Sequence, residues 1–334
     1  MIVILGDIHF SSQKDYYLEI CERFLDWFEN WDKNCEGNHL ILAGDLVQNA
    51  LNGGQVIKFL ERLYIKGQFS QIHVVVGNHD LKKVDGIDQL AYEFYKIKPG
   101  IKVYTEPTEI TIDGRNILML PYFDDVNQEG YTMPEYYGSI YKNPKFSNNY
   151  DLVVGHFAGS DVSYAGSTDC VENLNKIKTK KLCLGHIHTR ETDPGKYIGS
   201  VFSNRKGEND DTRAAWLWDT VNNTWSEEKL PIFSEFLQVI YPEDLPHSDA
   251  LVPVYTILNC GSERLARERY GNIFIRKVRA NMSDTVLKKI GSPGEFLSLS
   301  QANIGELFTA FLKEKDPPLD EKVQEECKAA LKIS

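Results

Sequence analysis

The stretch "MIVILGDIHF", residues 1–10, shows the pattern that decides the fold. Its first five residues are apolar and predict a short buried strand. Gly6 ends the apolar run, and two polar residues with side chains that can bind ligands, Asp7 and His9, follow it. Ligands of open α/β sheets gather beyond the carboxyl ends of the strands, so this strand end is a candidate part of a functional site.

The same pattern recurs four more times along the chain. Segments 16–31 and 53–64, between the first three strands, read as helices. Strands that alternate with helices favour βαβ units and a largely parallel sheet, so we predict an α/β fold. Each further copy is an apolar run that ends in glycine before polar residues: "HLILAGDLV" (39–47), "IHVVVGNHD" (72–80), "YDLVVGHF" (150–157) and "KKLCLGHIH" (180–188).

Polar residues from the five strand ends form one set of candidate ligands. His186 and His188 are two positions apart, and side chains at this spacing in an extended segment point into one shared site. Any single histidine of the set would be read as an ordinary core or surface residue. Taken together, the nine residues predict a constellation: Asp7, His9, Asp45, Asn78, His79, Asp80, His156, His186 and His188.

The chemistry of this set indicates divalent metal ions. Carboxylate, amide and imidazole groups without a thiolate suit a hard or borderline ion such as Mn²⁺, Zn²⁺ or Fe²⁺. The set exceeds the needs of one ion and fits a two-metal centre, in which the ions lie about 3.5–4 Å apart. We therefore expect two divalent ions, with Mn²⁺ the favoured metal and Mg²⁺, Zn²⁺ or Fe²⁺ as alternatives.

The motifs "GDIHF", "GDLVQN", "GNHD", "GHF" and "GHIH", in this order, resemble those of the calcineurin-like metallophosphoesterases. The resemblance implies a two-sheet α/β sandwich that hydrolyses phosphoesters. It also implies two ligand sets, in which Asp45 bridges the ions. The first ion would take Asp7, His9, Asp45 and His188, and the second would take Asp45, Asn78, His156 and His186.

The resemblance also assigns roles to the last two residues of "GNHD". His79 would protonate or stabilise the leaving oxygen rather than bind metal. Asp80 would orient the His79 imidazole, with a turn-forming role after the strand as the alternative. The two cations would lower the pKa of a bridging water and stabilise the charge of the transition state.

Within this family the chain is similar to the SbcD-type nucleases, including the nuclease subunits of T-even bacteriophage recombination endonucleases. The segment after the last motif, residues 196–220, carries this resemblance. It implies an exonuclease and endonuclease that acts on DNA in double-strand break repair, recombination and replication. The expected partners are DNA and an SMC-like ATPase of the Rad50/SbcC type, and a homodimer is compatible with the sequence.

The predicted domain organisation follows the same resemblance. Residues 1–232 would form the nuclease domain, residues 233–290 a small α+β DNA-capping domain, and residues 295–334 a helical tail that binds the ATPase. The tail contains two amphipathic stripes separated by Pro317 and Pro318, and it could instead cap the chain's own second domain. Shorter predictions are a strand at 196–203, a hairpin that turns at 222–223, three strands at 236–241, 252–258 and 272–278, and a helix at 262–270.

Basic residues near the last ligands are candidates for DNA contacts. Arg190, Arg205 and Arg213 could hold backbone phosphates. Alternatively, they are solvated or pair with Glu208 and the acidic residues 210–211. The second motif also departs from the family, because Gln48 stands where an acid or a histidine is usual. That change puts the tuning of the metal site and the handling of DNA in doubt.

The composition restricts the partners and the compartment. The chain has 37 Lys and Arg against 48 Asp and Glu, a net charge of −11. A free-standing nucleic-acid binder is usually basic, so metal ions and a partner would supply the positive charge, or the substrate is not a polyanion. We expect the first residues to form a strand rather than a signal peptide. No run reaches the roughly 20 apolar residues of a membrane span, and the six cysteines are scattered. We expect a cytoplasmic protein without membrane contact, in the host cytoplasm if the source is viral.

Two readings from other classes share parts of this pattern. A small-molecule phosphodiesterase or phosphatase would use the same site but needs neither a second domain nor a tail. A non-catalytic scaffold of the family would have lost ligands, and this chain has lost none.

Overall fold

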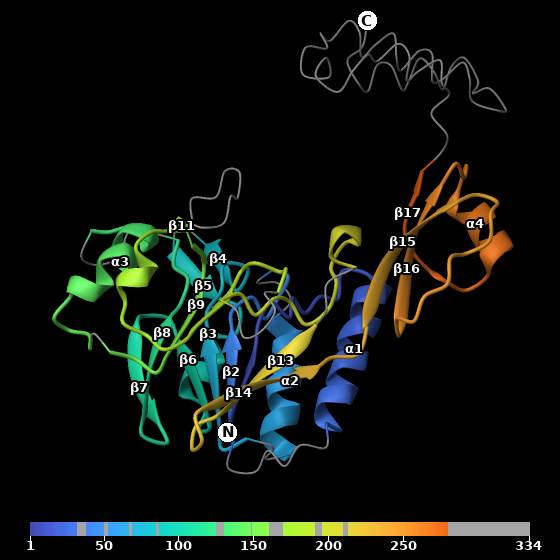
Figure 1. The fold of residues 1–334 in the computed structure, drawn as a ribbon. Coiled ribbons are helices and arrows are strands. Elements are labelled where there is room, and N and C mark those ends of the chain that lie inside the picture. Colours follow the sequence, from blue (N-terminus) through green and yellow to red (C-terminus); the bar gives the residue numbers. More distant parts are fainter. Residues whose placement is uncertain are drawn as a thin grey trace, which may run out of the picture. The chain divides into compact units, whose positions relative to one another are not determined.

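The computed structural model describes ten stretches of the chain (Figure 1): residues 1–31, 38–49, 53–66, 69–84, 87–124, 130–147, 149–159, 170–190, 196–209 and 213–279. The predicted tail at 295–334 lies outside these residues, as does the end of the predicted capping domain. In the part of the chain that is described, the fold is mixed α/β with several sheets and few helices, as predicted.

The largest sheet has six strands in the order β14-β13-β1-β2-β3-β6. The pairs β1–β2, β2–β3 and β3–β6 are parallel, which confirms the predicted βαβ pattern, whereas β13 joins β1 antiparallel. The predicted hairpin forms between β13 and β14. The six strands are β1 (Ile2–Leu5), β2 (His39–Ala43), β3 (Gln71–Val75), β6 (Ile101–Tyr104), β13 (Ala214–Asp219) and β14 (Thr224–Lys229).

A second sheet has four strands in the order β12-β9-β8-β7. Here β8, β9 and β12 run parallel to one another, and β7 pairs antiparallel with β8. Each strand that carries a motif therefore pairs with a parallel neighbour, so the polar residues that follow these strands lie at the same edge of their sheet. The four strands are β7 (Thr108–Ile112), β8 (Arg115–Leu120), β9 (Leu152–His156) and β12 (Leu182–Gly185).

The two sheets pack face to face and share one apolar core. Side chains from the first sheet, such as Ile4, Ile41 and Trp216, belong to the same buried cluster as Met119 and Val154 of the second. All of these side chains are at most 1% exposed. The alternation of inward and outward residues along each strand explains this packing, because every second side chain faces the same layer. The predicted two-sheet α/β sandwich is confirmed.

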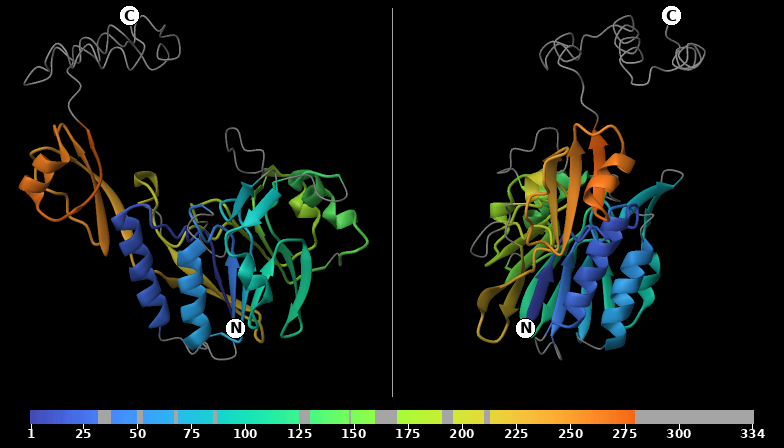
Figure 2. Two further views of the ribbon diagram at one scale, coloured as in Figure 1. Left: turned by 180° about the vertical axis from the view of Figure 1, so that it is seen from behind. Right: turned by 90° about the vertical axis from the view of Figure 1, so that its right-hand side faces the viewer.

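Helices cover the outer faces of the sandwich. Helices α1 (Asp15–Glu29) and α2 (Gly53–Lys66) lie side by side along the first sheet (Figures 1 and 2). Both were predicted from their apolar spacing. Phe24 of α1 packs against Phe59 of α2, and Arg62 joins the two helices by ion pairs. On the second sheet, α3 (Met133–Ser139) buries Tyr137 among residues of β8 and β9.

Short elements complete the described part of this region. β4 (Leu81–Val84) and β5 (Ile87–Leu90) form an antiparallel pair, and β10 (Ala158–Gly159) pairs with β11 (Cys170–Val171). Four 3₁₀ turns cover Glu93–Ile97, Ile140–Lys142, Leu174–Lys176 and Lys206–Glu208. Among the described residues, no helix combines the length and the apolarity that a membrane crossing requires.

The structure has no strand at 196–203, so this prediction from the sequence is wrong. Leu184 of β12 exchanges two backbone hydrogen bonds with this segment, through Lys196 and Ile198, and forms an isolated bridge with Tyr197. The chain then turns at Gly199, whose φ is 71°. The amide of Ser200 donates to the carbonyl of His188, so the segment follows the loop that carries the last ligands instead of extending the sheet.

A third sheet has the order β15-β16-β17. Its strands are β15 (Ser234–Ile240), β16 (Val252–Leu258) and β17 (Phe274–Arg279), and α4 (Glu263–Tyr270) connects the last two. Ser262 caps α4 by accepting a hydrogen bond from the Leu265 amide. All four elements agree with the predictions from the sequence.

The chain divides into two compact units. One comprises Met1–Leu237 with Pro246–Tyr255, and the other comprises Gln238–Leu245 with Thr256–Ser334. In the second unit, the described residues are 238–245 and 256–279. The first unit holds the sandwich and all of the motif residues.

Candidate metal centre

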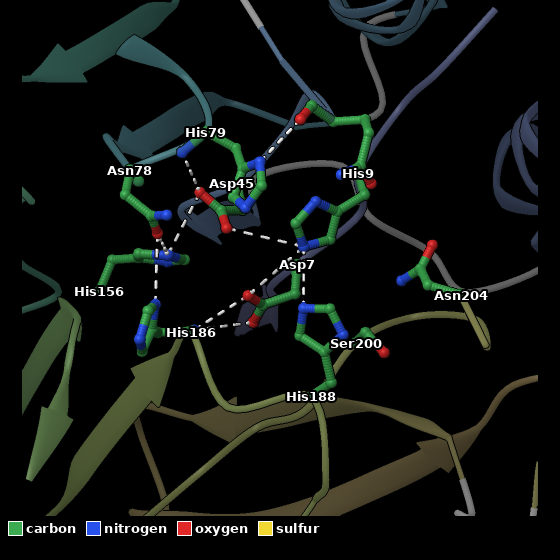
Figure 3. A network of polar contacts seen from close by, with 12 residues as sticks. Asp7, His9, Asp45, Asn78, His79, His156, His186, His188, Ser200 and Asn204 are labelled. Carbon is green, nitrogen blue, oxygen red and sulfur yellow. Dashed lines mark hydrogen bonds and ion pairs between the residues drawn. The ribbon is translucent and has the colours of Figure 1, made fainter. Parts of the chain in front are cut away.

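Five strand ends bring the motif residues to one edge of the sandwich (Figure 3). Loops after β1, β2 and β3 supply residues from the first sheet. His156 is the last residue of β9, and the loop after β12 adds the final histidines. The side chains point toward a common centre, although the first and last of them are 181 positions apart in the sequence: Asp7, His9, Asp45, Asn78, His79, His156, His186 and His188.

Four of these residues have a backbone conformation that side chains rarely adopt. The φ angle is 51° at Asp7, 52° at His9, 49° at Asp45 and 79° at His186. Such positive values cost roughly 1–3 kcal/mol each and cluster at functional sites. Strands β1, β2 and β12 are therefore followed by sharp turns that direct their polar side chains inward.

The motif glycines are needed because the loops approach one another closely. Gly44 has a φ of 85°, and a Cβ on this residue would lie 2.1 Å from Nδ1 of His156. A Cβ on Gly77 would lie 2.2 Å from the backbone nitrogen of Asp45. Only glycine accommodates both approaches.

One group of ligand atoms gathers Asp7, His9 and His188. Each contributes one atom to a cluster in which all atoms lie within 4.8 Å of one another. The Nε2 atoms of His9 and His188 face each other at 3.0 Å, and His9 Nε2 lies 4.0 Å from Oδ1 of Asp7. The Asp7 carboxylate also accepts a hydrogen bond from the His186 amide at 2.9 Å.

A second group gathers Asn78, His156 and His186. Oδ1 of Asn78 lies 3.1 Å from Nε2 of His156 and 3.2 Å from Nδ1 of His186. The other ring nitrogen of His156, Nδ1, donates to the Ala43 carbonyl at 2.9 Å, and this contact leaves Nε2 with a lone pair toward the centre in the neutral ring.

Asp45 lies between the two groups. Its Oδ1 is 3.2 Å from Nε2 of His156, whereas its Oδ2 is 3.6 Å from Nε2 of His9. The amide of His79 donates to Oδ1 at 2.9 Å and fixes the orientation of the carboxylate. Each oxygen of this one side chain therefore faces a different ligand group.

Burial and charge prepare the site for cations. Burial lowers the pKa of His9 to about 3, so the ring is neutral at neutral pH, as a metal ligand must be. Burial alone would raise the pKa of Asp45, but the His156 and His9 rings hold it below its usual range. Burial alone would lower the pKa of His156, but Asp45 raises it to about 10, so a cation at this ring must displace a proton. The donor set fits divalent metal ions, because the paired acids and imidazoles converge without a thiolate.

The backbone of Gln48 positions His79. Nδ1 of His79 donates to the Gln48 carbonyl at 2.7 Å, and its ring meets the His9 ring edge-on with centroids 5.0 Å apart. The side chain is partly exposed, unlike those of Asp7, His9 and His156. Nε2 of His79 is therefore the ring atom that a substrate can reach. The departure of the second motif at Gln48 leaves this contact unchanged, since the backbone makes it.

The carboxylate of Asp80 has different hydrogen-bond partners from the one expected. Its carboxylate is fully buried and accepts hydrogen bonds from the amides of Leu46, Val47 and Gly77, at 2.9, 3.2 and 2.8 Å. Burial, with the nearby Asp45, raises its pKa to about 7. The acid that was expected to orient His79 instead ties together the loops after β2 and β3, which is closer to the turn-forming alternative.

Two of the three predicted DNA-contacting arginines are buried in the protein. The guanidinium of Arg213 donates to the backbone carbonyls of His188 and Glu208, and the residue is 7% exposed. The side chain of Arg190 is 5% exposed and pairs with Glu227. These contacts leave neither cation available to phosphate, which corrects the expectation for Arg190 and Arg213. Arg205 is 66% exposed and pairs with Glu208.

One contributor to the site was missed in the sequence. Glu208 is 3% exposed and its carboxylate meets the His188 ring. Burial alone would raise the pKa of Glu208, but His188 lowers it to about 2. Glu208 was considered only as a partner for the arginines, because nothing in the sequence links it to a residue twenty positions earlier.

The fold and the donor set together define a metal-dependent phosphoesterase. The family model described as calcineurin-like phosphoesterase matches residues 1–190. Because this match covers more than half of the 334 residues, the chain belongs to the calcineurin-like phosphoesterase family. It is an enzyme of the class that hydrolyses phosphoesters with divalent metal ions.

Individual proteins also match the chain. It is 30% identical over 153 residues to exonuclease subunit 1 of Enterobacteria phage T4, a match that covers 45% of this chain and 42% of that relative. The chain thus matches less than half of the relative's length. Solved structures that match include a phosphopantetheinyl hydrolase from Mycobacterium tuberculosis, with a TM-score of 0.39 and 15% identity over 60% of this chain and 89% of that one. A further match is an archaeal phosphodiesterase, with a TM-score of 0.33 and 13% identity over 69% and 99% of the two chains.

Proposed function

We propose that this protein is a two-metal-dependent DNA nuclease that hydrolyses phosphodiester bonds. The observation that carries the proposal is the position of Asp45, whose two oxygens face separate groups of ligand atoms. A single carboxylate in this position is suited to bridge two cations. The partly exposed His79 beside it gives the site a proton donor.

Each group of ligand atoms would hold one cation. The first would use Asp7, His9, Asp45 and His188, and the second would use Asp45, Asn78, His156 and His186. When bound, the two cations would supply Lewis-acid activation of the phosphoester and of the attacking water. Oxygen and imidazole donors favour Mn²⁺ in our proposal, with Mg²⁺, Zn²⁺ and Fe²⁺ as the alternatives.

The chain's own residues would handle the proton and the orientation of the site. The Gln48 carbonyl holds Nδ1 of His79, so the opposite nitrogen, Nε2, would deliver a proton to the leaving oxygen. The Asp80 carboxylate, with its three amide contacts, would keep the loop of His79 next to the loop of Asp45.

DNA is the substrate that the relative supports. Exonuclease subunit 1 of phage T4 is named as a nuclease subunit, and its 30% identity to this chain lies in the matched 153 residues. The net charge of −11 is unfavourable for DNA binding by the chain alone. We therefore include a partner in the proposal, an SMC-like ATPase of the Rad50/SbcC type, with roles in double-strand break repair, recombination and replication.

The domain organisation belongs to the same proposal. Residues 1–232 would carry the nuclease activity, residues 233–290 would cap the DNA, and residues 295–334 would bind the ATPase. Arg205 would be the phosphate contact nearest to the site, because its side chain is 66% exposed. A cytoplasmic location and a homodimer are compatible with this organisation.

A small-molecule phosphodiesterase or phosphatase is the second candidate. The same ligand groups and His79 would serve it, so the metal centre does not separate the two functions. The two candidates differ in the size of the substrate. A nuclease must prefer a polynucleotide to a single phosphodiester, and a small-molecule enzyme must not.

The test compares substrates on one protein preparation. The full chain is incubated with Mn²⁺ and either linear duplex DNA, single-stranded oligonucleotides, a panel of nucleotides or bis-p-nitrophenyl phosphate. The Asp45→Ala variant, prepared in parallel, is the matched control for contaminating nucleases. We expect Mn²⁺-dependent cleavage of the DNA substrates by the wild-type chain, and none by the variant.

Two results would contradict the proposal. Hydrolysis of nucleotides or of the small diester without cleavage of DNA would assign the small-molecule function. Cleavage of DNA to the same extent by Asp45→Ala would show that the activity belongs to another protein or another site.

A further inference from the structure

Glu208 lies directly behind one of the proposed metal ligands. Its Oε1 accepts a hydrogen bond from Nδ1 of His188 at 3.0 Å, and its side chain is 3% exposed. The opposite ring nitrogen of His188, Nε2, faces His9 and the centre of the site (Figure 3). The imidazole of His188 is therefore held between a buried carboxylate and the position where a cation would bind.

A second set of contacts fixes Glu208 itself. Its Oε2 accepts a hydrogen bond from the amide of Asn204 at 2.9 Å. Arg213 donates to the backbone carbonyl of Glu208 at 2.8 Å and to that of His188 at 2.9 Å. Glu208 and His188 are thus joined twice, once through their side chains and once through the guanidinium that links their backbones.

Ion pairing with arginine does not account for this carboxylate. Arg205 also contacts Oε1, at 2.9 Å, but its side chain is 66% exposed, so water competes for this guanidinium. The guanidinium of Arg213 comes no nearer than 4.0 Å to the carboxylate, and its shorter contacts are to backbone carbonyls and to serine hydroxyls. Oε1 therefore has two side-chain partners, and His188 is the less exposed of them, at 23% against 66% for Arg205.

We propose that Glu208 is a positioning residue that selects the Nδ1–H form of His188 and aims Nε2 at the first metal ion. The inference rests on the proposed function, because it concerns a ligand of the proposed centre. It extends that function to a residue outside the metal-binding set. Glu208 acts through His188 and touches neither the metal nor the substrate.

The physical consequence is a higher affinity of the first site for its metal ion. A carboxylate that accepts from Nδ1 fixes which nitrogen is protonated and makes the other nitrogen a better donor. Removal of such a partner typically lowers metal affinity 10–100-fold, by the general behaviour of groups behind metal ligands. Only the first of the two ions should be affected, since the ligands of the second do not contact Glu208 among the described residues.

The experiment measures metal binding directly. The full chain and the variants Glu208→Gln and Glu208→Ala are titrated with Mn²⁺ by calorimetry, and the thermal stability of each metal-free protein is recorded. We expect one of two Mn²⁺ sites to weaken by about 10–100-fold in Glu208→Ala and by less in Glu208→Gln, whose amide oxygen can still accept from Nδ1. The second site should keep the wild-type affinity.

A matched control removes a different acid close to the same loop. Glu227→Gln deletes the carboxylate that pairs with Arg190, two residues beyond His188. This variant should bind both ions with wild-type affinity. Equal weakening in Glu227→Gln would show that any disturbance of the loop has the same effect, and would overturn a specific role for Glu208.

The protonation of His188 gives an independent readout. Nitrogen-15 NMR of the protein loaded with diamagnetic Zn²⁺ should show a proton on Nδ1 of His188 and none on Nε2. A proton on Nε2, or Glu208 variants that lose stability while both sites keep their affinity, would overturn the proposal. A wild-type chain that binds no divalent ion would instead refute the proposed function together with this inference, and the titration of the wild type identifies that case.

Discussion

Histidines gather at two places along the first sheet, and only one of the gatherings resembles a metal site. At the ends of β1, β2 and β3, histidines surround Asp7 and Asp45. Along β2, β3 and β6, His39, His73 and Tyr104 form a chain of hydrogen bonds. Nδ1 of His39 lies 3.1 Å from Nε2 of His73, and Nδ1 of His73 lies 2.7 Å from the Tyr104 hydroxyl.

The difference lies in the acids and in the backbone. Every group of three side chains suited to a metal, among the described residues, includes Asp7 or Asp45 and none includes His39 or His73. The strand ends that hold the acids also have positive φ angles, whereas the second gathering lies in regular strands. The histidines of the second gathering bond to each other and to Tyr104, whereas carboxylates on sharply turned loops make a site for cations.

The largest expected effect breaks the acidic gathering. Asp45→Ala removes the side chain that faces both ligand groups, so activity should fall by more than the roughly 100-fold typical of a lost partner behind a ligand. Mn²⁺ titration should show the loss of at least one site. His73→Gln is the control from the other gathering and should keep both sites. Two sites of wild-type affinity in Asp45→Ala would contradict the bridging role.

The next effect separates catalysis from metal binding inside the acidic gathering. His79→Ala should lower turnover by roughly 10²–10⁴-fold, the range of a lost general acid, and should leave the metal content unchanged. Gln48→Ala keeps the carbonyl that holds His79 and should therefore retain most activity. Metal content that falls in step with activity in His79→Ala would make His79 a ligand.

The pH dependence of the free energy of unfolding tests the second gathering, that of His39, His73 and Tyr104. Burial lowers the pKa of His73 from 6.5 to about 3. The unfolded chain therefore takes up a proton below pH 6.5 that the folded chain refuses, so this residue destabilises the fold as the pH falls toward 3. The loss is at most about 1.4 kcal/mol per pH unit. Denaturant unfolding of metal-free wild type and His73→Gln should diverge below pH 6.5, and parallel curves would contradict the burial argument.

The smallest effect concerns the arginines beside the site. Arg205→Ala should reduce the salt dependence of DNA binding by about one phosphate contact. Arg190→Ala should leave that slope unchanged, because its side chain is buried and paired with Glu227. Binding measured at several salt concentrations checks both variants. Equal slopes for wild type and Arg205→Ala would remove the last of the predicted DNA contacts.

The parallel strands and the residues of the site could be predicted from local patterns, whereas the two-sheet sandwich followed from the resemblance of the motifs to a known family. An apolar run that ends at Gly44 or Gly77 and a polar residue after it need no knowledge of distant neighbours. The contacts that complete the site join distant segments. Glu208 meets His188 only after the chain turns at Gly199, and the burial of Arg190 against Trp216 depends on strand β13.

The roles of Gln48 and Asp80 were hidden for a related reason. The third motif suggested that Asp80 holds its neighbour His79, yet the Gln48 carbonyl holds it, and a backbone group leaves no trace in the residue type. Asp80 instead accepts three amide hydrogen bonds across two loops. The residues of a site can be predicted from residue type and spacing, whereas their hydrogen-bond partners depend on how distant segments fold together.

A crystal structure of the Mn²⁺-soaked protein, with anomalous scattering data at the manganese edge, tests the central claim most directly. The account predicts two anomalous peaks about 3.5–4 Å apart, on either side of the Asp45 carboxylate. One peak should lie next to Asp7, His9 and His188, and the other next to Asn78, His156 and His186. A single peak, or peaks away from Asp45, would contradict the two-metal centre.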